Sequence, residues 1–143
     1  MTLTVLIVDD EENIRYALRE TLKEGGFIVI EAGDGRTALA LAEEKEPEII
    51  LLDYKLPDMN GLEVLRELNT KPGNPVVIVL TGYGTIEMAV EAMRLGAFHF
   101  LTKPWERAEL ASRLQAASEL ISLRIAREEM KTCLLYTSPS PRD

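Results

Sequence analysis

Cysteine and histidine are nearly absent from this chain of 143 residues, since Cys133 and His99 are the single examples of each. One cysteine cannot form a disulfide within the chain, so nothing indicates an oxidising compartment and a cytoplasmic location is expected. One histidine argues against a metal site built from several imidazoles and against a Ser–His–Asp triad.

Positive charge is also scarce, with 16 lysines and arginines against 24 acidic residues and a net charge of −8. Because nucleic acids and anionic lipids are bound through Lys and Arg, neither is expected as a direct partner. No apolar run approaches the roughly 18 residues that a membrane span needs, and residues 1–8 lack the features of a secretory signal. An acidic domain of this kind is suited to holding a divalent metal or to regulating an attached domain.

Five short apolar runs alternate with segments of helical period. Near-continuous runs of Val, Ile, Leu and Phe predict strands that are buried on both faces. The runs are Leu3–Val8, Phe27–Ile30, Glu48–Leu52, Val76–Leu80 and Phe98–Leu101. Strict alternation of strand and helix predicts one α/β domain, with a parallel sheet covered by helices on both sides.

The segments between these runs carry apolar residues at every third or fourth position, as amphipathic helices do. The first helix is expected to end at Gly25-Gly26, the fourth to begin near Thr85 and stop at Gly96, and the fifth to begin near Trp105. The positions expected to face the core are Ile14, Leu18 and Leu22; Ala38, Leu41 and Ala42; Leu62, Leu65 and Leu68; Ile86, Ala89, Val90 and Met93; and Leu110, Leu114, Ala117 and Ile121.

The end of the chain differs in character from the rest. We expect residues 1–122 to form the domain and residues 123–132 to extend the fifth helix as a linker, leading to another domain, to a dimer partner or only to a frayed end. Residues 133–143 are expected to be a disordered or non-native tail, because the final segment has no helical period and contains two prolines. The tail looks like a cloning scar that replaces a native continuation carrying an output domain.

Polar side chains follow four of the five predicted strands. Asp9 and Asp10 follow the first strand, Asp53 ends the third, Thr81 ends the fourth, and Lys103 follows the fifth. Because right-handed crossovers place the carboxyl ends of parallel strands at one edge, these side chains are expected to converge there.

Carboxylates that lie this close repel one another unless a cation joins them. Mg²⁺ is the natural candidate, because it binds one or two carboxylates together with water and phosphate oxygens. Phosphoryl transfer needs such a metal to neutralise charge. Asp53 is then the candidate nucleophile that forms an aspartyl phosphate, and Lys103 and Thr81 are candidates to bind the phosphoryl oxygens.

Each of these residues also has an ordinary structural interpretation. Asp9 and Asp10 suit the beginning of a helix, Asp53 suits a turn, and Thr81 before a glycine is common in turns. A lysine on a loop is usually solvated. The prediction of a site therefore depends on the combination, in which four strand ends carry groups suited to one reaction.

Four segments together resemble the receiver domains of bacterial two-component response regulators, over Leu3 to about Leu123. They are VLIVDDE (Val5–Glu11), LLDYKLPDMNGLEVL (Leu51–Leu65), TGYG (Thr81–Gly84) and GAFHFLTKPW (Gly96–Trp105). The resemblance implies a flavodoxin-like fold with strand order 2-1-3-4-5. It also implies phosphorelay signalling in which a sensor histidine kinase is the partner.

The resemblance implies a role for several residues. Asp53 corresponds to the phosphoacceptor, and Asp9 and Asp10 to the acidic pair that positions Mg²⁺, with the backbone carbonyl of Lys55 completing the protein ligands. Lys103 corresponds to the family's lysine, whose bond to the following proline is expected to be cis.

Signal output is expected to depend on a switch. By the resemblance, Thr81 is the switch hydroxyl and Phe100 the switch aromatic. The face made by the fourth helix, fifth strand and fifth helix would change shape and could form a homodimer. The chain would not be an enzyme beyond Mg²⁺-dependent phosphorylation and dephosphorylation of itself.

The residues after Thr81 look most like receivers of sigma-54-dependent activators with an AAA+ ATPase domain. Trp105 departs from that pattern and also occurs in receivers joined to enzymes of cyclic-dinucleotide metabolism. Phe98-His99 stands where winged-helix regulators often have two aspartates, which disfavours that class. The output type therefore stays open, with transcriptional control preferred.

Three other functions compete with this interpretation. A haloacid-dehalogenase-like phosphatase would need a D-x-D motif after the first strand, where the chain has adjacent Asp9 and Asp10. A flavin or nucleotide module would need a glycine-rich or hydroxyl-rich phosphate loop there. A phosphorylation-independent interaction domain would not need the full acidic and basic set.

Overall fold

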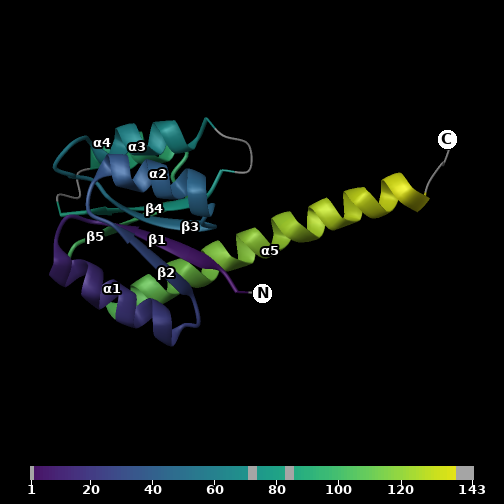
Figure 1. Cartoon of the computed structure of the whole chain (residues 1–143), viewed down its shortest axis with the longest axis horizontal. Coiled ribbons are helices and arrows are strands. Elements are labelled where there is room, and N and C mark those ends of the chain that lie inside the picture. Colours follow the sequence, from purple (N-terminus) through teal and green to yellow (C-terminus); the bar gives the residue numbers. More distant parts are fainter. Residues whose placement is uncertain (1, 71–73, 83–85, 138–143) are drawn as a thin grey trace.

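The computed structural model describes residues 2–70, 74–82 and 86–137, with side chains as far as Met130. Within these ranges, five strands and five helices alternate along the chain (Figure 1). The elements are β1 (Thr4–Val8), α1 (Glu12–Glu24), β2 (Ile28–Ala32), α2 (Gly35–Lys45), β3 (Ile49–Asp53), α3 (Gly61–Leu68), β4 (Val76–Thr81), α4 (Ile86–Arg94), β5 (His99–Thr102) and α5 (Arg107–Thr137).

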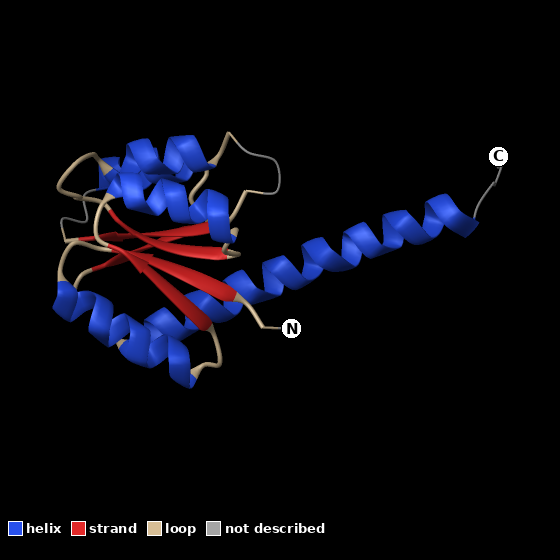
Figure 2. Cartoon of the chain, viewed as in Figure 1, coloured by secondary structure: helices blue, strands red, loops and turns tan. Residues whose placement is uncertain are grey.

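The strands form one parallel sheet in the order β2-β1-β3-β4-β5, which confirms the predicted flavodoxin-like fold. Helices α1 and α5 cover one face of this sheet, and α2, α3 and α4 cover the other (Figure 2). The carboxyl ends of β1 and β3 are neighbours at the centre of the sheet, because Val8 pairs with Leu52.

The core has two layers because successive strand residues point to opposite faces. Val5 and Ile7 of β1 belong to the layer beneath α1 and α5, whereas Leu6 and Val8 belong to the layer beneath α2, α3 and α4. Every residue of β3 and β4 is buried, as the apolar runs predicted. The two layers fix the central strands from both sides and hold their carboxyl ends in place.

The edge strand β2 differs from its prediction in two respects. It begins one residue later and ends two residues later than expected, because the Phe27 amide donates to the Leu22 carbonyl at the end of α1. At the far end, Glu31 and Ala32 continue the pairing with β1. The strand is also not buried on both faces, since Ile28 is 52% exposed at the edge of the sheet.

Helix α4 presents its apolar stripe to solvent, which corrects the predicted orientation. Ile86, Val90 and Met93 were expected inside, but their exposed fractions are 81%, 50% and 45%. The fully buried position is Ala92, and Ala89, which was also expected inside, is half-buried. The predicted start near Thr85 lies outside the described residues. A stripe of three large apolar side chains therefore remains on the surface of α4.

Helix α5 packs on the sheet and then continues away from it (Figure 1). Its four predicted core residues are buried as far as Ile121, and the described side chains from Ser122 to Met130 are exposed. The helix continues through Cys133 to Thr137, so residues 133–137 of the expected disordered or non-native tail are helical, and their native or foreign origin stays a prediction. No glycine or proline interrupts the chain there, and nothing in the sequence therefore ends the helix earlier. Residues 138–143 of the predicted tail lie outside the described residues.

Among the helices that the structure describes, none combines the length and the apolar character needed to cross a bilayer.

Candidate functional site

Asp9 is the most deeply buried polar residue of the site. It directly follows β1, and its amide continues the pairing with β2 by donating to the Ala32 carbonyl at 3.1 Å. One carboxylate oxygen accepts the Glu11 amide at 2.9 Å, and the side chain is fully shielded from solvent. Asp10, the next residue, is exposed. The β1–α1 turn thus offers one carboxylate fixed inside the protein and one that faces the solvent.

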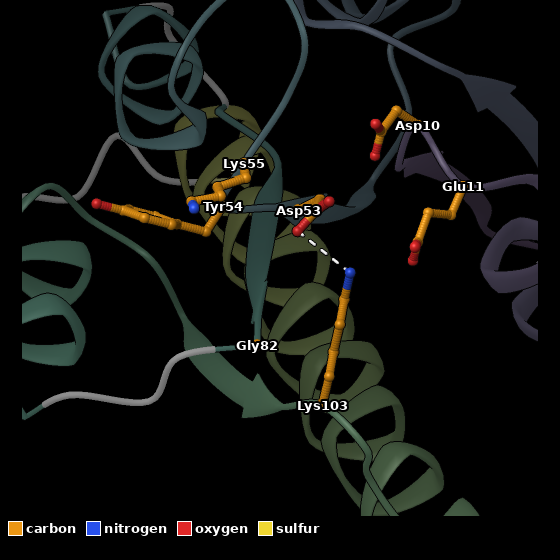
Figure 3. Close-up of a pocket in the computed structure, with 7 residues that line it drawn as sticks. All are labelled: Asp10, Glu11, Asp53, Tyr54, Lys55, Gly82 and Lys103. Atoms are coloured by element: carbon orange, nitrogen blue, oxygen red, sulfur yellow. Dashed lines mark ion pairs between the residues drawn. The ribbon is translucent and has the colours of Figure 1, made fainter.

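Lys103 joins the first and third strands at this edge. Its ammonium lies 3.0 Å from Asp9 Oδ2 and 3.3 Å from Asp53 Oδ1. The dashed line in Figure 3 marks the ion pair with Asp53. Asp53 is the last residue of β3 and is 6% exposed. The Lys103 amide donates to the Thr81 carbonyl at 2.7 Å, and the Lys103–Pro104 bond is cis as predicted.

The electrostatic surroundings of Asp53 raise its pKa above the ordinary value but leave the carboxylate mostly ionised at neutral pH. Burial of the side chain and the nearby charge of Asp9 raise the pKa of Asp53 to about 6, although Lys103 opposes the rise. Burial alone would lower the pKa of Lys103, but its hydrogen bond to Asp9 and the charge of Asp53 raise it overall. Lys103 therefore stays charged, and the carboxylates remain only partly compensated.

The three aspartates fit a divalent cation. Asp9, Asp10 and Asp53 each offer an oxygen, and these oxygens lie within 4.8 Å of one another. Three carboxylates and one ammonium leave a net charge of −2 when all are ionised. Hard oxygen ligands of this kind suit Mg²⁺, which also keeps several waters. The site therefore has the donors and the uncompensated charge that a magnesium ion would satisfy.

An open pocket adjoins these carboxylates (Figure 3). Lys103 points across it toward Asp53, and Asp10 lies on the opposite side. The residues that line it are Asp10, Glu11, Asp53, Tyr54, Lys55, Gly82 and Lys103. A small anionic group entering this pocket would meet the Asp53 carboxylate and the Lys103 ammonium together.

The two predicted switch residues lie beside the pocket and do not line it. Thr81 ends β4, is 2% exposed and pairs with Thr102 of β5. Phe100, on β5, is half-buried against the core layer beneath α2, α3 and α4. The structure thus brings Asp9, Asp10, Asp53 and Lys103 together, whereas Thr81 and Phe100 are not among the residues that line the pocket.

The family model described as the response regulator receiver domain matches residues 5–115. The chain belongs to the response regulator receiver family. The resemblance predicted from its sequence is therefore confirmed.

Named relatives and a solved structure agree with this assignment. The receiver is 39% identical over 120 residues to regulatory protein AtoC of Escherichia coli, covering 84% of this chain and 26% of AtoC. It is 40% identical over 116 residues to the transcriptional regulatory protein FixJ of Rhizobium meliloti, covering 81% of this chain and 57% of FixJ. The crystal structure of the receiver domain of a Vibrio parahaemolyticus LuxO-type repressor matches with a TM-score of 0.85 and 29% identity, covering 90% and 98% of the two chains.

The receiver thus spans about a quarter of AtoC and little more than half of FixJ. These relatives, a regulatory protein and a transcriptional regulator by name, are considerably longer than the part that the receiver matches. What is shown for this chain is the receiver domain of a two-component response regulator.

Sequence reasoning missed a charged triad behind the acidic pair. Arg15 of α1 donates to the backbone carbonyl of Asp9, and its Nε lies 3.2 Å from a Glu31 carboxylate oxygen. Arg19 binds the other oxygen of Glu31. Arginines on a helix are usually solvated, so nothing in the sequence pattern singles out Arg15. The triad secures the β1–α1 turn that carries Asp9.

Gly61 is required by the close approach of two backbones at the start of α3. A Cβ atom there would lie 2.3 Å from the Asp53 carbonyl oxygen and 2.9 Å from the Tyr54 Cα. The Gly61 amide also donates to the Tyr54 carbonyl at 2.7 Å. The backbone that carries the candidate nucleophile therefore packs directly on this glycine.

We expect Gly61→Ala to lower the free energy of unfolding by about 2–3 kcal/mol, because backbone atoms cannot move aside as a flexible side chain can. Urea denaturation followed by circular dichroism measures the change. Gly82→Ala is the matched control, because a Cβ at Gly82 meets no atom within 4 Å. An equal, small effect of both substitutions would contradict this account of Gly61.

Proposed function

We propose that the receiver accepts a phosphoryl group on Asp53 from a sensor histidine kinase. The observation that carries the proposal is the position of Asp53, which opens to the pocket while the Lys103 ammonium lies 3.3 Å from its carboxylate. An Asp53 oxygen would attack the phosphorus of the kinase phosphohistidine as the phosphorus–nitrogen bond breaks. The imidazole leaves with the electron pair of that bond, and the Lys103 ammonium binds a phosphoryl oxygen.

Asp9, Asp10 and Asp53, with the backbone carbonyl of Lys55, are the residues that would hold Mg²⁺. When bound, the metal neutralises charge on the transferring phosphoryl group. Asp9 is kept in place by the Glu11 amide and by Arg15, so one ligand is fixed before any metal arrives. Asp10 is exposed and remains free to adjust.

Phosphorylation would act on the rest of the receiver through Thr81 and Phe100. The Thr81 hydroxyl would move to bind a phosphoryl oxygen, and Phe100 would turn into the space that it leaves. The α4-β5-α5 face would then change as a shift between existing states, and a nearly complete shift needs about 5.5 kcal/mol of differential stabilisation. Charge-assisted bonds to the phosphoryl group are a source of that energy.

The exposed side chains of Ile86, Val90 and Met93 support a contact role for this face. We propose that this face forms a homodimer or docks an output domain. A transcriptional output domain is preferred, because relatives such as FixJ are transcriptional regulators by name. The AAA+ activator class and the cyclic-dinucleotide enzymes are both compatible with the sequence. The receiver itself would carry out only its own phosphorylation and dephosphorylation. Its net charge of −8 disfavours direct contact with nucleic acid.

Removal of the metal tests the proposed function. The chain is incubated with acetyl phosphate and MgCl₂, and its intact mass is measured with and without EDTA. We expect one added phosphoryl group with Mg²⁺ and none with EDTA. Reduction by borohydride followed by peptide mapping should place the modification at Asp53. Labelling that persists in EDTA, or that maps to another residue, would reject the proposal.

A further inference from the structure

Asp58 lies in the loop between β3 and α3 but binds the N-terminus of α2. Its Oδ1 accepts the Gly35 amide at 2.8 Å, and its Oδ2 accepts the Arg36 amide at 3.0 Å. These are the first two amides of α2, which have no carbonyl partner within the helix. The helix has its own cap, since Asp34 accepts the Thr37 amide at 2.7 Å. Asp58 therefore adds a second cap from a distant part of the sequence.

The loop and the helix also touch beside these hydrogen bonds. A Cβ atom on Gly35 would lie 2.4 Å from Met59 Cγ and 2.5 Å from its Sδ. Met59 packs in turn against the core layer beneath α2, α3 and α4. The contact thus combines the charged cap from Asp58 with packing by Met59. The Met59 side chain fills the space beside Gly35, so a residue with a Cβ atom would fit there only if Met59 moved.

At the start of this loop the Tyr54 amide donates to the Leu80 carbonyl of β4 at 2.8 Å, and further hydrogen bonds that the structure describes run within the loop and to its flanks. Lys55 forms an isolated antiparallel bridge with Asn60, and Asn60 and Glu63 form a capping box at the start of α3. These bonds fix the two ends of the loop relative to β3 and α3. Its hydrogen bonds to α2 come from Asp58, across 22 and 23 residues of sequence.

We propose that Asp58 is a positioning residue for the phosphorylation pocket, because it ties the loop that carries the Lys55 carbonyl to the N-terminus of α2. The inference rests on the proposed function, in which that carbonyl is a metal ligand. The hydrogen bonds from Gly35 and Arg36 lower the pKa of Asp58. The carboxylate is therefore ionised at neutral pH, where both of its oxygens accept hydrogen bonds.

The test compares two caps of the same helix. Asp58→Ala removes the cap that belongs to the loop, whereas Asp34→Ala removes the local cap and leaves the loop contacts intact. Both are expected to weaken α2 to a similar degree. Mg²⁺ affinity is measured by Trp105 fluorescence or by calorimetry, and hydrogen exchange is measured at the amides of residues 54–61.

We expect Asp58→Ala to weaken Mg²⁺ binding about 3–5-fold and to speed exchange in the loop, because both hydrogen bonds of Asp58 to α2 are lost and only part of their free energy, about that of a single hydrogen bond, acts on the metal site. Asp34→Ala is expected to change Mg²⁺ affinity less than twofold. Asp58→Asn should fall between wild type and Asp58→Ala, because its side chain keeps one accepting oxygen. Equal Mg²⁺ affinities for Asp58→Ala and Asp34→Ala would overturn the inference. Failure of the wild-type chain to bind Mg²⁺ would instead overturn the proposed function.

Discussion

Replacement of Asp53 by asparagine is expected to abolish phosphoryl transfer to the receiver and, at the same time, to stabilise the metal-free domain. Asparagine has nearly the same shape but no nucleophilic carboxylate oxygen, so no acyl phosphate can form. It also removes a charge that the fold accommodates poorly. The two effects have opposite signs, so a variant that is merely unfolded cannot produce both.

The gain in stability follows from the raised pKa of Asp53, about 6 in the folded chain against an ordinary value of 3.8. A carboxyl group with a raised folded-state pKa stabilises the fold at low pH, and this stabilisation is lost as the pH rises through that pKa. The wild-type chain should therefore lose stability between pH 3.8 and about 6. In the Asp53→Asn variant this carboxyl group is absent, so the free energy of unfolding should fall less over the same pH range.

At pH 7 we expect the variant to be more stable by about 1–2 kcal/mol, since each pKa unit corresponds to about 1.4 kcal/mol and solvent in the open pocket reduces the effect. For a domain of this size the gain raises Tm by about 3–6 °C. Differential scanning calorimetry at pH 4 and pH 7 without metal measures it, and added Mg²⁺ should reduce the difference.

Asp10→Asn is the matched control for the charge change. Asp10 belongs to the same acidic cluster but is exposed, so its loss should leave the metal-free stability nearly unchanged while weakening Mg²⁺ binding. Mass spectrometry after incubation with acetyl phosphate reports transfer to each variant. Phosphoryl uptake by Asp53→Asn, or a Tm at pH 7 below that of the wild-type chain, would contradict the assignment.

The acidic and basic side chains of the site were predictable because topology alone brings them together. Once the apolar runs predict a parallel sheet, the residues after its strands must meet at one edge, whatever their detailed contacts. Asp9, Asp53 and Lys103 confirm this reasoning by lying within ion-pair distance. The sheet order itself came from the resemblance, since alternation of strand and helix does not specify it.

What the sequence did not predict depends on packing. Helical periodicity identified a stripe of Ile86, Val90 and Met93, but the sheet packs against the smaller Ala92 and leaves the stripe exposed. Asp58 caps a helix that begins 23 residues earlier, and Arg15 reaches a backbone carbonyl. Such contacts depend on how loops fold back in space, and neither spacing nor residue type marks them.

Replacement of Lys103 by methionine is expected to slow phosphoryl transfer about 100-fold, while Mg²⁺ binding becomes tighter. Transfer slows because the ammonium is a preorganised positive charge at the place where the phosphoryl oxygens would lie, and loss of one such donor costs 10²–10³-fold in comparable sites. Metal binding tightens because the cation and the ammonium, 3.0 Å from Asp9 and 3.3 Å from Asp53, compete for the same carboxylates.

The metal-free Lys103→Met variant should also be less stable at neutral pH. Asp9 is fully buried and loses the cation that binds its Oδ2, and Asp53 loses the charge that opposes the rise of its pKa. Leaving a buried charge without its partner costs about 2–4 kcal/mol. Protonation of Asp53, whose pKa is raised, relieves its repulsion with Asp9. The difference in unfolding free energy between the variant and the wild-type chain should therefore shrink toward pH 4.

Lys103→Arg separates charge from geometry in this experiment. It keeps the positive charge but replaces a compact ammonium by a planar guanidinium. Most of the stability lost in Lys103→Met should therefore be restored, while phosphoryl transfer stays at least tenfold slower than in the wild-type chain. Acetyl phosphate labelling rates, Mg²⁺ titration by Trp105 fluorescence and urea denaturation give the three readouts. Weaker Mg²⁺ binding in Lys103→Met would show that the lysine supports the metal site instead of competing with it, and the mechanism proposed for the pocket would then fail.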